Sequence, residues 1–457
     1  MTKYITQLSL LFIAISALVS CGCVNAMVKH WPGGGLGEVT CDAHYGEGKY
    51  AVYPGNNFAM HMIPFTEGAF KLKGKTGITS AVMPHYTIPF PFNQNPKYKE
   101  NVDNGDSKYI LQDLLRDKYN YDGVVCTDWL FTGDETTVDV FLTGKSWGVE
   151  GLSIAERHYK VLMAGVDQFG GNNEKGPVIE VSNMAVKEHG EDFMRAHFEQ
   201  SAVRLLKNIF RIGFFENPYV NVDETKAIVG KPEFMKAGYD AQLKSVVMLK
   251  NKANALPLKK NKPVYIPKKF TPAERNFLGM EIPEKLGYPV SIEIVKKYFN
   301  ITENPDEADN ALVFVNSPNS GISFNSVNTK KGGNVYVPIS LQYGEYTAKE
   351  AHETCIAGGD PQEKFTNRSY KNKKNKAVNI SDLGTINDTF KNMKGKPVIV
   401  SINMNNPMVF AEFEKNTNAL LVHFSVQDQA LLDILTVVSE PIAFANACQY
   451  GNRRITI

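Results

Sequence analysis

The sequence has little cysteine, and its opposite charges almost cancel. Six cysteines are scattered over 457 residues, and no CxxC pair with metal-binding spacing occurs. A disulfide framework or a zinc site is therefore not expected. The formal net charge is +2, from 50 basic and 48 acidic residues. This balance argues against a nucleic acid, or an anionic membrane surface, as the main partner.

Long apolar runs are also scarce, and the one that stands out lies at the start of the chain. Residues 1–26 contain Lys3, an apolar stretch at 8–19 and small residues that end at Cys21. This layout is typical of an export signal, and Cys21 resembles the cysteine of a bacterial lipoprotein box. We therefore expect an exported protein, periplasmic or an outer-membrane lipoprotein, that meets the membrane only through a lipid anchor at Cys21.

Two other interpretations of residues 1–26 stay open. The apolar stretch is too short for a stable membrane span, but it also fits a strand or helix of the first domain. The segment can also be a wrongly assigned start, and the protein is then cytoplasmic.

Strand-like and helical patterns alternate in the rest of the first half. The strand-like runs are 78–83, 121–127 and 165–171, and the segments with helical spacing are 104–119, 152–163 and 193–210. Such alternation is typical of an α/β protein with a parallel sheet.

The second half repeats this kind of alternation after a segment that contains two prolines. We expect a linker at 216–237. The strands expected beyond it are 263–267, 311–315, 397–402 and 419–424, and a helix is expected at 428–435.

A carboxylate stands directly after the buried run at 121–127. Asp128 is followed by Trp129 and then by turn residues. Barrel enzymes place catalytic groups at the carboxyl ends of their parallel strands. An aspartate in this position can equally cap the next helix. The segment by itself leaves both interpretations open.

Residues 29–35 read KHWPGGG and suggest a strand that runs into a glycine-rich loop. A triple glycine can cradle a phosphate, which would make this a nucleotide site, but the helix that such a cradle needs does not follow. The polar segment at 38–54, which contains Asp42 and His44, is instead expected to be a long loop over a strand end.

Four segments occur in an order that resembles glycoside hydrolase family 3, above all its two-domain bacterial β-glucosidases. They are 29–35 (KHWPGGG), 122–129 (DGVVCTDW), 165–171 and 245–258. The resemblance implies a (β/α)8 TIM-type barrel that is followed by an α/β sandwich domain. Since only about four of the eight barrel strands can be placed, we expect the C-terminal half of the barrel at 27–215 and the sandwich at 238–457.

The resemblance also implies an activity, which is that of a retaining, exo-acting β-glycosidase on oligosaccharides or glycosides. Asp128 matches the nucleophile, and Lys29 and His30 match residues that bind sugar hydroxyls. Trp129 would stack on an apolar sugar face, and Tyr86 is a further expected binding residue. A lysine near Asp128 would also keep the carboxylate ionised. No metal or organic cofactor is implied.

A retaining glycosidase needs a proton donor opposite its nucleophile. In two-domain members of the family it is a glutamate of the second domain, which suggests Glu345. In the acetylglucosaminidase branch an Asp-x-His pair has this role, and Asp42 with His44 is similar. Each has an ordinary alternative, because Glu345 also fits a solvated loop carboxylate and His44 a plain loop histidine.

A partial barrel leaves sheet edges open and an apolar face uncovered. We therefore expect this chain alone to have little stability and weak activity. The alternative to an active glycosidase is a catalytically inactive truncated relative that binds glycan, or a gene fragment.

Overall fold

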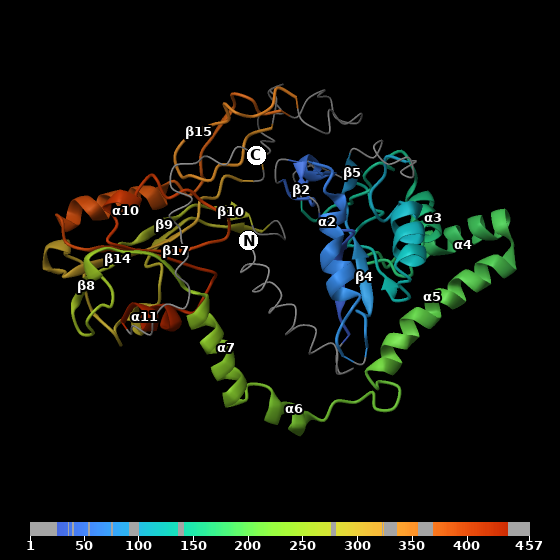
Figure 1. Cartoon of the computed structure of the whole chain (residues 1–457), viewed down its shortest axis with the longest axis horizontal. Coiled ribbons are helices and arrows are strands. Elements are labelled where there is room, and N and C mark those ends of the chain that lie inside the picture. Colours follow the sequence, from blue (N-terminus) through green and yellow to red (C-terminus); the bar gives the residue numbers. More distant parts are fainter. Residues whose placement is uncertain are drawn as a thin grey trace. The chain divides into compact units, whose positions relative to one another are not determined.

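The computed structural model describes residues 25–436 except for 35, 39–40, 54, 75, 91–99, 136–140, 276–279, 322, 324–335 and 355–368. The chain divides into two compact units (Figure 1). One comprises Met1–Val220 with Thr354–Arg368, and the other comprises Asn221–Glu353 with Ser369–Ile457. The apolar stretch at 8–19 and Cys21 lie outside the described residues. No described helix has the length and apolarity needed to cross a membrane.

The first unit is organised around a row of parallel strands. β1 (Met27–Trp31) pairs with β4 (Ala81–Pro84), which pairs with β6 (Val124–Val125). The row continues through a parallel bridge between Cys126 and Gln168. The segment expected as a strand at 165–171 is therefore reduced to this one bridge. Because the strands are parallel, their carboxyl ends meet at one edge.

A second, smaller sheet follows the glycine-rich loop. It consists of β2 (Leu36–Gly37), β3 (Tyr50–Val52) and β5 (Ile88–Phe90). A short helical turn, η2 (Gly46–Gly48), precedes β3. Since the loop leads into β2 and not into a helix, it lacks the element that a phosphate cradle requires.

The first unit contains several helices besides η2. They are α2 (Phe58–Ile63), η3 (Pro64–Ala69), η5 (Tyr109–Lys118), α3 (Ile154–Ala164), α4 (Lys175–His189) and α5 (Glu191–Arg211). Ser153 and Glu156 form a capping box at the start of α3. The helix predicted at 104–119 begins later, because the Asp103 carboxylate accepts hydrogen bonds from the Gly105 and Asp106 amides and holds a turn there.

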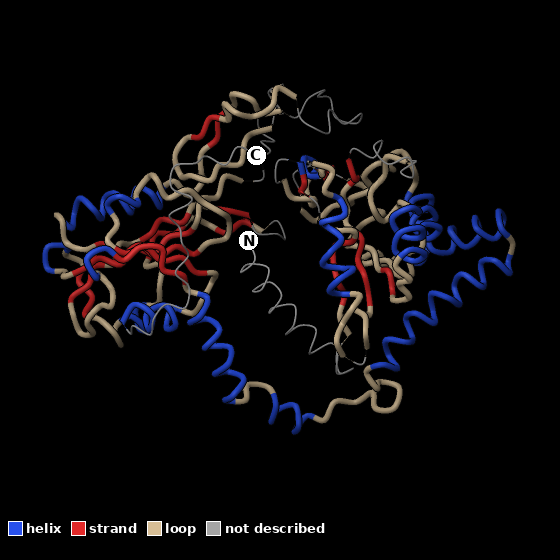
Figure 2. The backbone as a smooth tube through the Cα atoms, viewed as in Figure 1, coloured by secondary structure: helices blue, strands red, loops and turns tan. Residues whose placement is uncertain are grey.

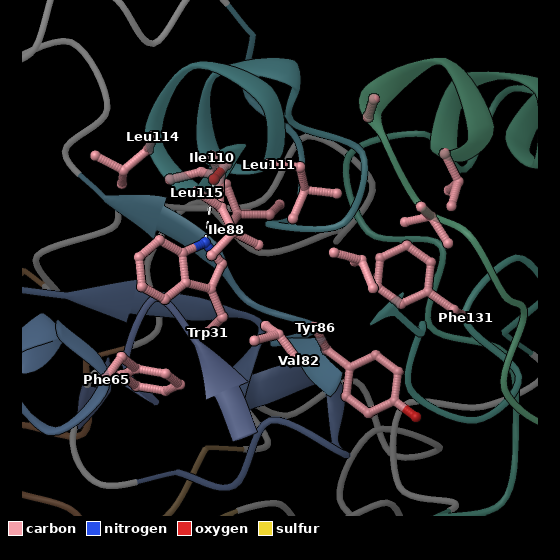
Figure 3. Packing of buried hydrophobic residues seen from close by; sticks show 14 of the residues in the cluster. Trp31, Phe65, Val82, Tyr86, Ile88, Ile110, Leu111, Leu114, Leu115 and Phe131 are labelled. Carbon is pink, nitrogen blue, oxygen red and sulfur yellow. Dashed lines mark hydrogen bonds between the residues drawn. The ribbon is translucent and has the colours of Figure 1, made fainter. Parts of the chain in front are cut away.

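The core of the first unit lies between the parallel strands and these helices. Trp31 is fully buried at the end of β1, and its indole N–H donates to the Ile110 carbonyl of η5 (Figure 3). Val82 of β4 and Val125 of β6 point to the same cluster. This face of the sheet is therefore sealed by η5, and the strand ends are held in fixed positions.

The second unit contains a six-stranded sheet with helices on both faces (Figures 1 and 2). The strand order is β13 (Asn300–Thr302), β8 (Pro263–Tyr265), β14 (Asn310–Asn316), β17 (Val398–Asn403), β18 (Ala419–His423) and β7 (Val247–Asn251), with only β7 antiparallel. Leu312 of β14 packs in the core with α11 (Asp428–Thr436), whereas Val313 packs in the core with α10 (Ser381–Met393). Successive residues of the strand thus point to opposite faces of the sheet and pack against different helices.

The strands predicted for this half are confirmed as β8, β14, β17 and β18, and the predicted helix is confirmed as α11. The segment expected to be a linker, 216–237, contains the helix α6 (Val222–Ile228) and the start of α7 (Pro232–Ser245). The remaining elements are η6 (Lys252–Asn254), β9 (Lys269–Thr271), β10 (Glu274–Arg275), β11 (Glu281–Ile282), β12 (Lys285–Gly287), α8 (Ile292–Val295), η7 (Pro305–Glu307), β15 (Tyr346–Thr347), β16 (Lys374–Asn375) and η8 (Glu414–Asn416).

Candidate active site

The carboxyl ends of β1 and β6 bring a histidine and a carboxylate together. His30 Nε2 lies 3.1 Å from Asp128 Oδ2. The other oxygen of Asp128 accepts a hydrogen bond of 2.7 Å from the Trp129 amide. The side chain of Asp128 is 7% exposed and that of His30 is 25% exposed, so the carboxylate is buried and the histidine is partly buried.

The surroundings of Asp128 keep it ionised. Burial alone would raise its pKa, but the hydrogen bonds from His30 and the Trp129 amide, with the charges of His30 and Lys29, outweigh burial and lower the pKa. Lys29 itself is exposed and lies in the middle of β1. The carboxylate is therefore ionised at neutral pH.

Trp129 directly follows Asp128, and Tyr86 contacts the Trp129 backbone. Trp129 is 56% exposed. Its indole ring lies against Gly171, where an added Cβ would be 2.5 Å from Trp129 Cδ1. Gly171, with φ of +66°, is needed for this close approach. Tyr86 is buried, and its hydroxyl donates to the Trp129 carbonyl. Trp129 thus offers an open ring face, and Tyr86 supports the segment that carries Asp128.

Asp42 and His44 form a second carboxylate–histidine pair in the loop before β3. Asp42 Oδ1 lies 2.7 Å from His44 Nδ1 and also accepts from the His44 amide at 2.8 Å. The His44 ring packs against Tyr86, with ring centroids 5.4 Å apart, and stacks on Phe141. Burial would raise the pKa of Asp42, but its hydrogen bonds with His44 lower it. The loop is therefore anchored beside the residue that supports Asp128.

Glu345, the other predicted proton donor, lies in the second unit. Its carboxylate is 57% exposed and forms an ion pair of 2.7 Å with Lys374. Its environment is that of an exposed salt bridge.

His85 joins the site, and the sequence reasoning missed it as a site residue. It follows β4 directly, and its ring meets the His30 ring edge-on at 5.2 Å. Burial and the neighbouring charge of His30 lower the pKa of His85 to about 3. A sequence signal for His85 existed, because it stands at the carboxyl end of a predicted strand. The neighbouring Tyr86 was instead predicted to be the binding residue.

A buried acidic pair was also missed. Asp103 and Asp106 are almost fully buried. Burial raises the pKa of Asp103, to which the charge of Asp106 adds, and burial raises the pKa of Asp106 to about 7 although its hydrogen bond with Asp103 lowers it. Among the described residues, no group of three or more histidine, cysteine or acidic side chains could hold a metal ion. Two cysteines among the described residues, Cys41 and Cys126, are buried thiols that form no disulfide.

An ionised carboxylate at the end of a parallel strand lies where barrel enzymes place catalytic groups. Comparison with known proteins agrees. The family model described as "Glycosyl hydrolase family 3 N terminal domain" matches residues 10–207. The chain belongs to glycosyl hydrolase family 3 and is β-glucosidase-like. The match begins inside the segment 1–26, whose role as an export signal stays a prediction.

Two curated relatives show the extent of the similarity. Beta-glucosidase C of Emericella nidulans is 31% identical over 418 residues, which are 92% of this chain and 55% of that protein. A periplasmic beta-glucosidase/beta-xylosidase of Dickeya chrysanthemi is 33% identical over 307 residues, which are 65% of this chain and 41% of that protein. The chain thus spans about half the length of the curated relatives it matches.

Solved structures show the same fold. A β-glucosidase from Listeria innocua matches with a TM-score of 0.55 at 16% identity, over 90% of this chain and 49% of that one. A β-N-acetylglucosaminidase from Paenibacillus matches with a TM-score of 0.53 at 15% identity, over 90% of this chain and 65% of that one. The α/β fold of the chain is therefore that of family 3 structures.

Proposed function

We propose that this chain is a retaining, exo-acting β-glycosidase of the β-glucosidase type, which releases terminal sugars from oligosaccharides or glycosides. The observation that carries the proposal is the Asp128 carboxylate, held by His30 at 3.1 Å and by the Trp129 amide at 2.7 Å. Two names among the relatives, beta-glucosidase C and beta-glucosidase/beta-xylosidase, point to the same substrate class.

The fold supports a finer proposal. We assign β1, β4, β6 and the strand position at Gln168 to consecutive strands of a (β/α)8 barrel, and the six-stranded unit to the α/β sandwich domain of the family. The parallel pairing of the first four positions is what such a barrel requires.

In the first chemical step an Asp128 oxygen attacks the anomeric carbon. The carbon–oxygen bond to the leaving group breaks as a glycosyl ester forms on Asp128, and the leaving oxygen takes a proton from the general acid. Water then attacks the ester, loses its proton to the same group and regenerates Asp128. Lys29 and His30 would bind sugar hydroxyls, and Trp129 would stack on the sugar.

For the general acid we favour His44 over Glu345. Asp42 accepts from His44 Nδ1 and so fixes the ring, which leaves Nε2 to exchange a proton with the leaving oxygen. His44 also packs on Tyr86, whose hydroxyl contacts the backbone next to Asp128. Glu345 is engaged with Lys374 instead.

Trapping with a 2-fluoro-β-glucoside tests the proposal. A 2-fluoro sugar should accumulate as an ester on Asp128, and peptide mass spectrometry should find the label on the peptide that contains residues 124–129. Asp128→Asn should abolish labelling, whereas His189→Ala, remote in the sequence at the end of α4, should leave it unchanged. Label on another carboxylate would refute the assignment, and sugar binding without labelling would favour the non-catalytic glycan-binding alternative.

Export with a lipid anchor at Cys21 is a separate proposal. The Dickeya relative is named as periplasmic, which supports it. Metabolic labelling with a radioactive fatty acid should mark the native chain and not a Cys21→Ser variant. Unlabelled chain found in the cytoplasm would contradict both the anchor and the export signal.

A further inference from the structure

His85 is held rigidly at the strand ends. Its backbone amide donates to the Trp31 carbonyl at 2.9 Å, which ties the end of β4 to the end of β1. Its Nδ1 lies 2.7 Å from the Thr87 hydroxyl and 3.2 Å from the Thr87 amide. Asn104 in turn donates to the Thr87 hydroxyl oxygen and carbonyl. Thr87 and Asn104 are fully buried, so the residues that hold the His85 ring belong to the interior of the unit.

These contacts decide which ring nitrogen of His85 carries the proton. A backbone amide can only donate, so the contact from the Thr87 amide requires that Nδ1 accept. The Thr87 hydroxyl can donate as well, because its oxygen receives the Asn104 amide. The neutral imidazole therefore has its hydrogen on Nε2.

Nε2 of His85 lies next to the glycine-rich loop that contains Gly34. It is 3.8 Å from the position that a Cβ on Gly34 would take, and Gly34 is exposed. The His85 ring also contacts His30, which holds Asp128. The low pKa of His85, about 3, keeps the ring neutral above that pH. The site thus contains a neutral donor with fixed direction beside the nucleophile.

We propose that His85 is a specificity-determining residue, whose Nε2–H donates a hydrogen bond to one hydroxyl oxygen of the sugar bound at Asp128. The proposal rests on the glycosidase function above. The contact requires an oxygen acceptor on the sugar, so His85 selects against a sugar that lacks this one hydroxyl.

Calorimetric binding of methyl β-glucoside and its four monodeoxy analogues (positions 2, 3, 4 and 6) tests the proposal without requiring turnover. In the native chain one analogue should lose roughly tenfold in affinity through this contact. In His85→Ala this loss of affinity for the one analogue should disappear, while the affinities of the other three analogues relative to methyl β-glucoside should stay unchanged. His85→Gln, whose amide N–H reaches near the Nε2 position, should restore most of it, and His85→Asn should not. His189→Ala is the matched control.

The outcomes separate the two proposals. If the native chain binds methyl β-glucoside and all deoxy penalties persist in His85→Ala, the role of His85 is wrong while the glycosidase proposal stands. If it binds with the predicted His85 coupling but no 2-fluoro sugar is trapped, the glycosidase chemistry fails and the binding role stands. If it binds no sugar, both fail. Long-range proton–nitrogen NMR gives an independent check, since a proton found on Nδ1 of His85 would overturn the inference.

Discussion

At the scale of single residues, the site depends on keeping one buried carboxylate charged. Burial of Asp128 opposes ionisation, and the hydrogen bond from His30 is the first of the contacts that overcome it. The same ring is expected to bind a sugar hydroxyl, so His30 would serve both the substrate and the nucleophile.

Replacing His30 by alanine should therefore raise the pKa of Asp128. A protonated carboxyl cannot attack, so the acidic limb of kcat/KM should move to higher pH, and kcat/KM at neutral pH should fall by about tenfold or more. The pH profile of aryl β-glucoside hydrolysis measures both effects. His189→Ala should match the native profile, and an unmoved acidic limb in His30→Ala would show that His30 does not control Asp128.

The buried pair of Asp103 and Asp106 gives a second residue-scale prediction. Because the folded-state pKa of Asp106 is raised to about 7 from 3.8, the folded chain holds a proton that the unfolded chain releases in this range. Stability should therefore fall as pH rises from 3.8 to about 7, by up to roughly 1.4 kcal/mol per pH unit. The charges of Lys160, Glu100 and Arg157 act on the same group.

Asp106→Asn should flatten this dependence, because the amide is neutral at every pH. Urea unfolding between pH 4 and pH 8 measures it, and Asp113→Asn, on the exposed side of η5, should keep the native slope. A slope that persists in Asp106→Asn would assign it to other groups.

The sequence predicts part of the site for a physical reason. Asp128 follows the buried strand β6, His30 lies near the end of β1, and a parallel sheet brings the ends of its strands together whatever the details of the loops. The role of His85 was not predictable, because its ring direction depends on Thr87 and on Asn104, which is distant in sequence. The pKa of Asp106 was equally hidden, since burial of the turn at 103–106 is a property of the fold.

At the scale of elements, α5 is attached to the strand row through Asp167. This carboxylate is 1% exposed, and it binds Arg116 of η5 at 2.7 Å and Arg204 of α5 at 2.9 Å. It also accepts from Ser201 and from the Val125 amide. One side chain therefore links two helices to β6, the strand that leads to Asp128.

Removing Arg116 should be costly, because it leaves the Asp167 charge buried with a partner missing. We expect Arg116→Met to lower the free energy of unfolding by about 3–5 kcal/mol. Arg195→Ala is the matched control on α5, since Arg195 forms an exposed pair with Glu199 that should contribute at most about 1 kcal/mol. Equal effects of the two variants in urea unfolding would contradict the linking role of Asp167.

Element boundaries were harder to predict than element types. The apolar run at 78–83 predicts a strand, and the structure has β4 at Ala81–Pro84 because pairing with β1 starts only at Met27. Helix propensity in 104–119 gives way to the turn that Asp103 holds. In both cases a tertiary or capping contact decides the first residue of the element.

At the scale of the whole molecule, the second half was more predictable than the first. β14, β17 and β18 are buried on both faces and read as continuous apolar runs, which is the sequence signature of central parallel strands. In the first unit the strands are short, and β6 has only Val124–Val125. Polar loops and glycine-rich segments make up more of the first unit, and apolar patterns in the sequence do not predict the structure of such segments.

The two units have separate cores, and this leads to a prediction for the complete chain. Leu115 is buried among helices and strands of the first unit, and Ile399 lies in the sheet of the second. Replacing either by alanine should cost about 2–5 kcal/mol, which corresponds to roughly 5–15 °C in Tm for a unit of this size. Scanning calorimetry should show two transitions, of which Leu115→Ala lowers one and Ile399→Ala lowers the other. A single transition that both variants shift equally would mean that the units unfold as one, so that a loss of packing around Ile399 would also disrupt the support of Asp128.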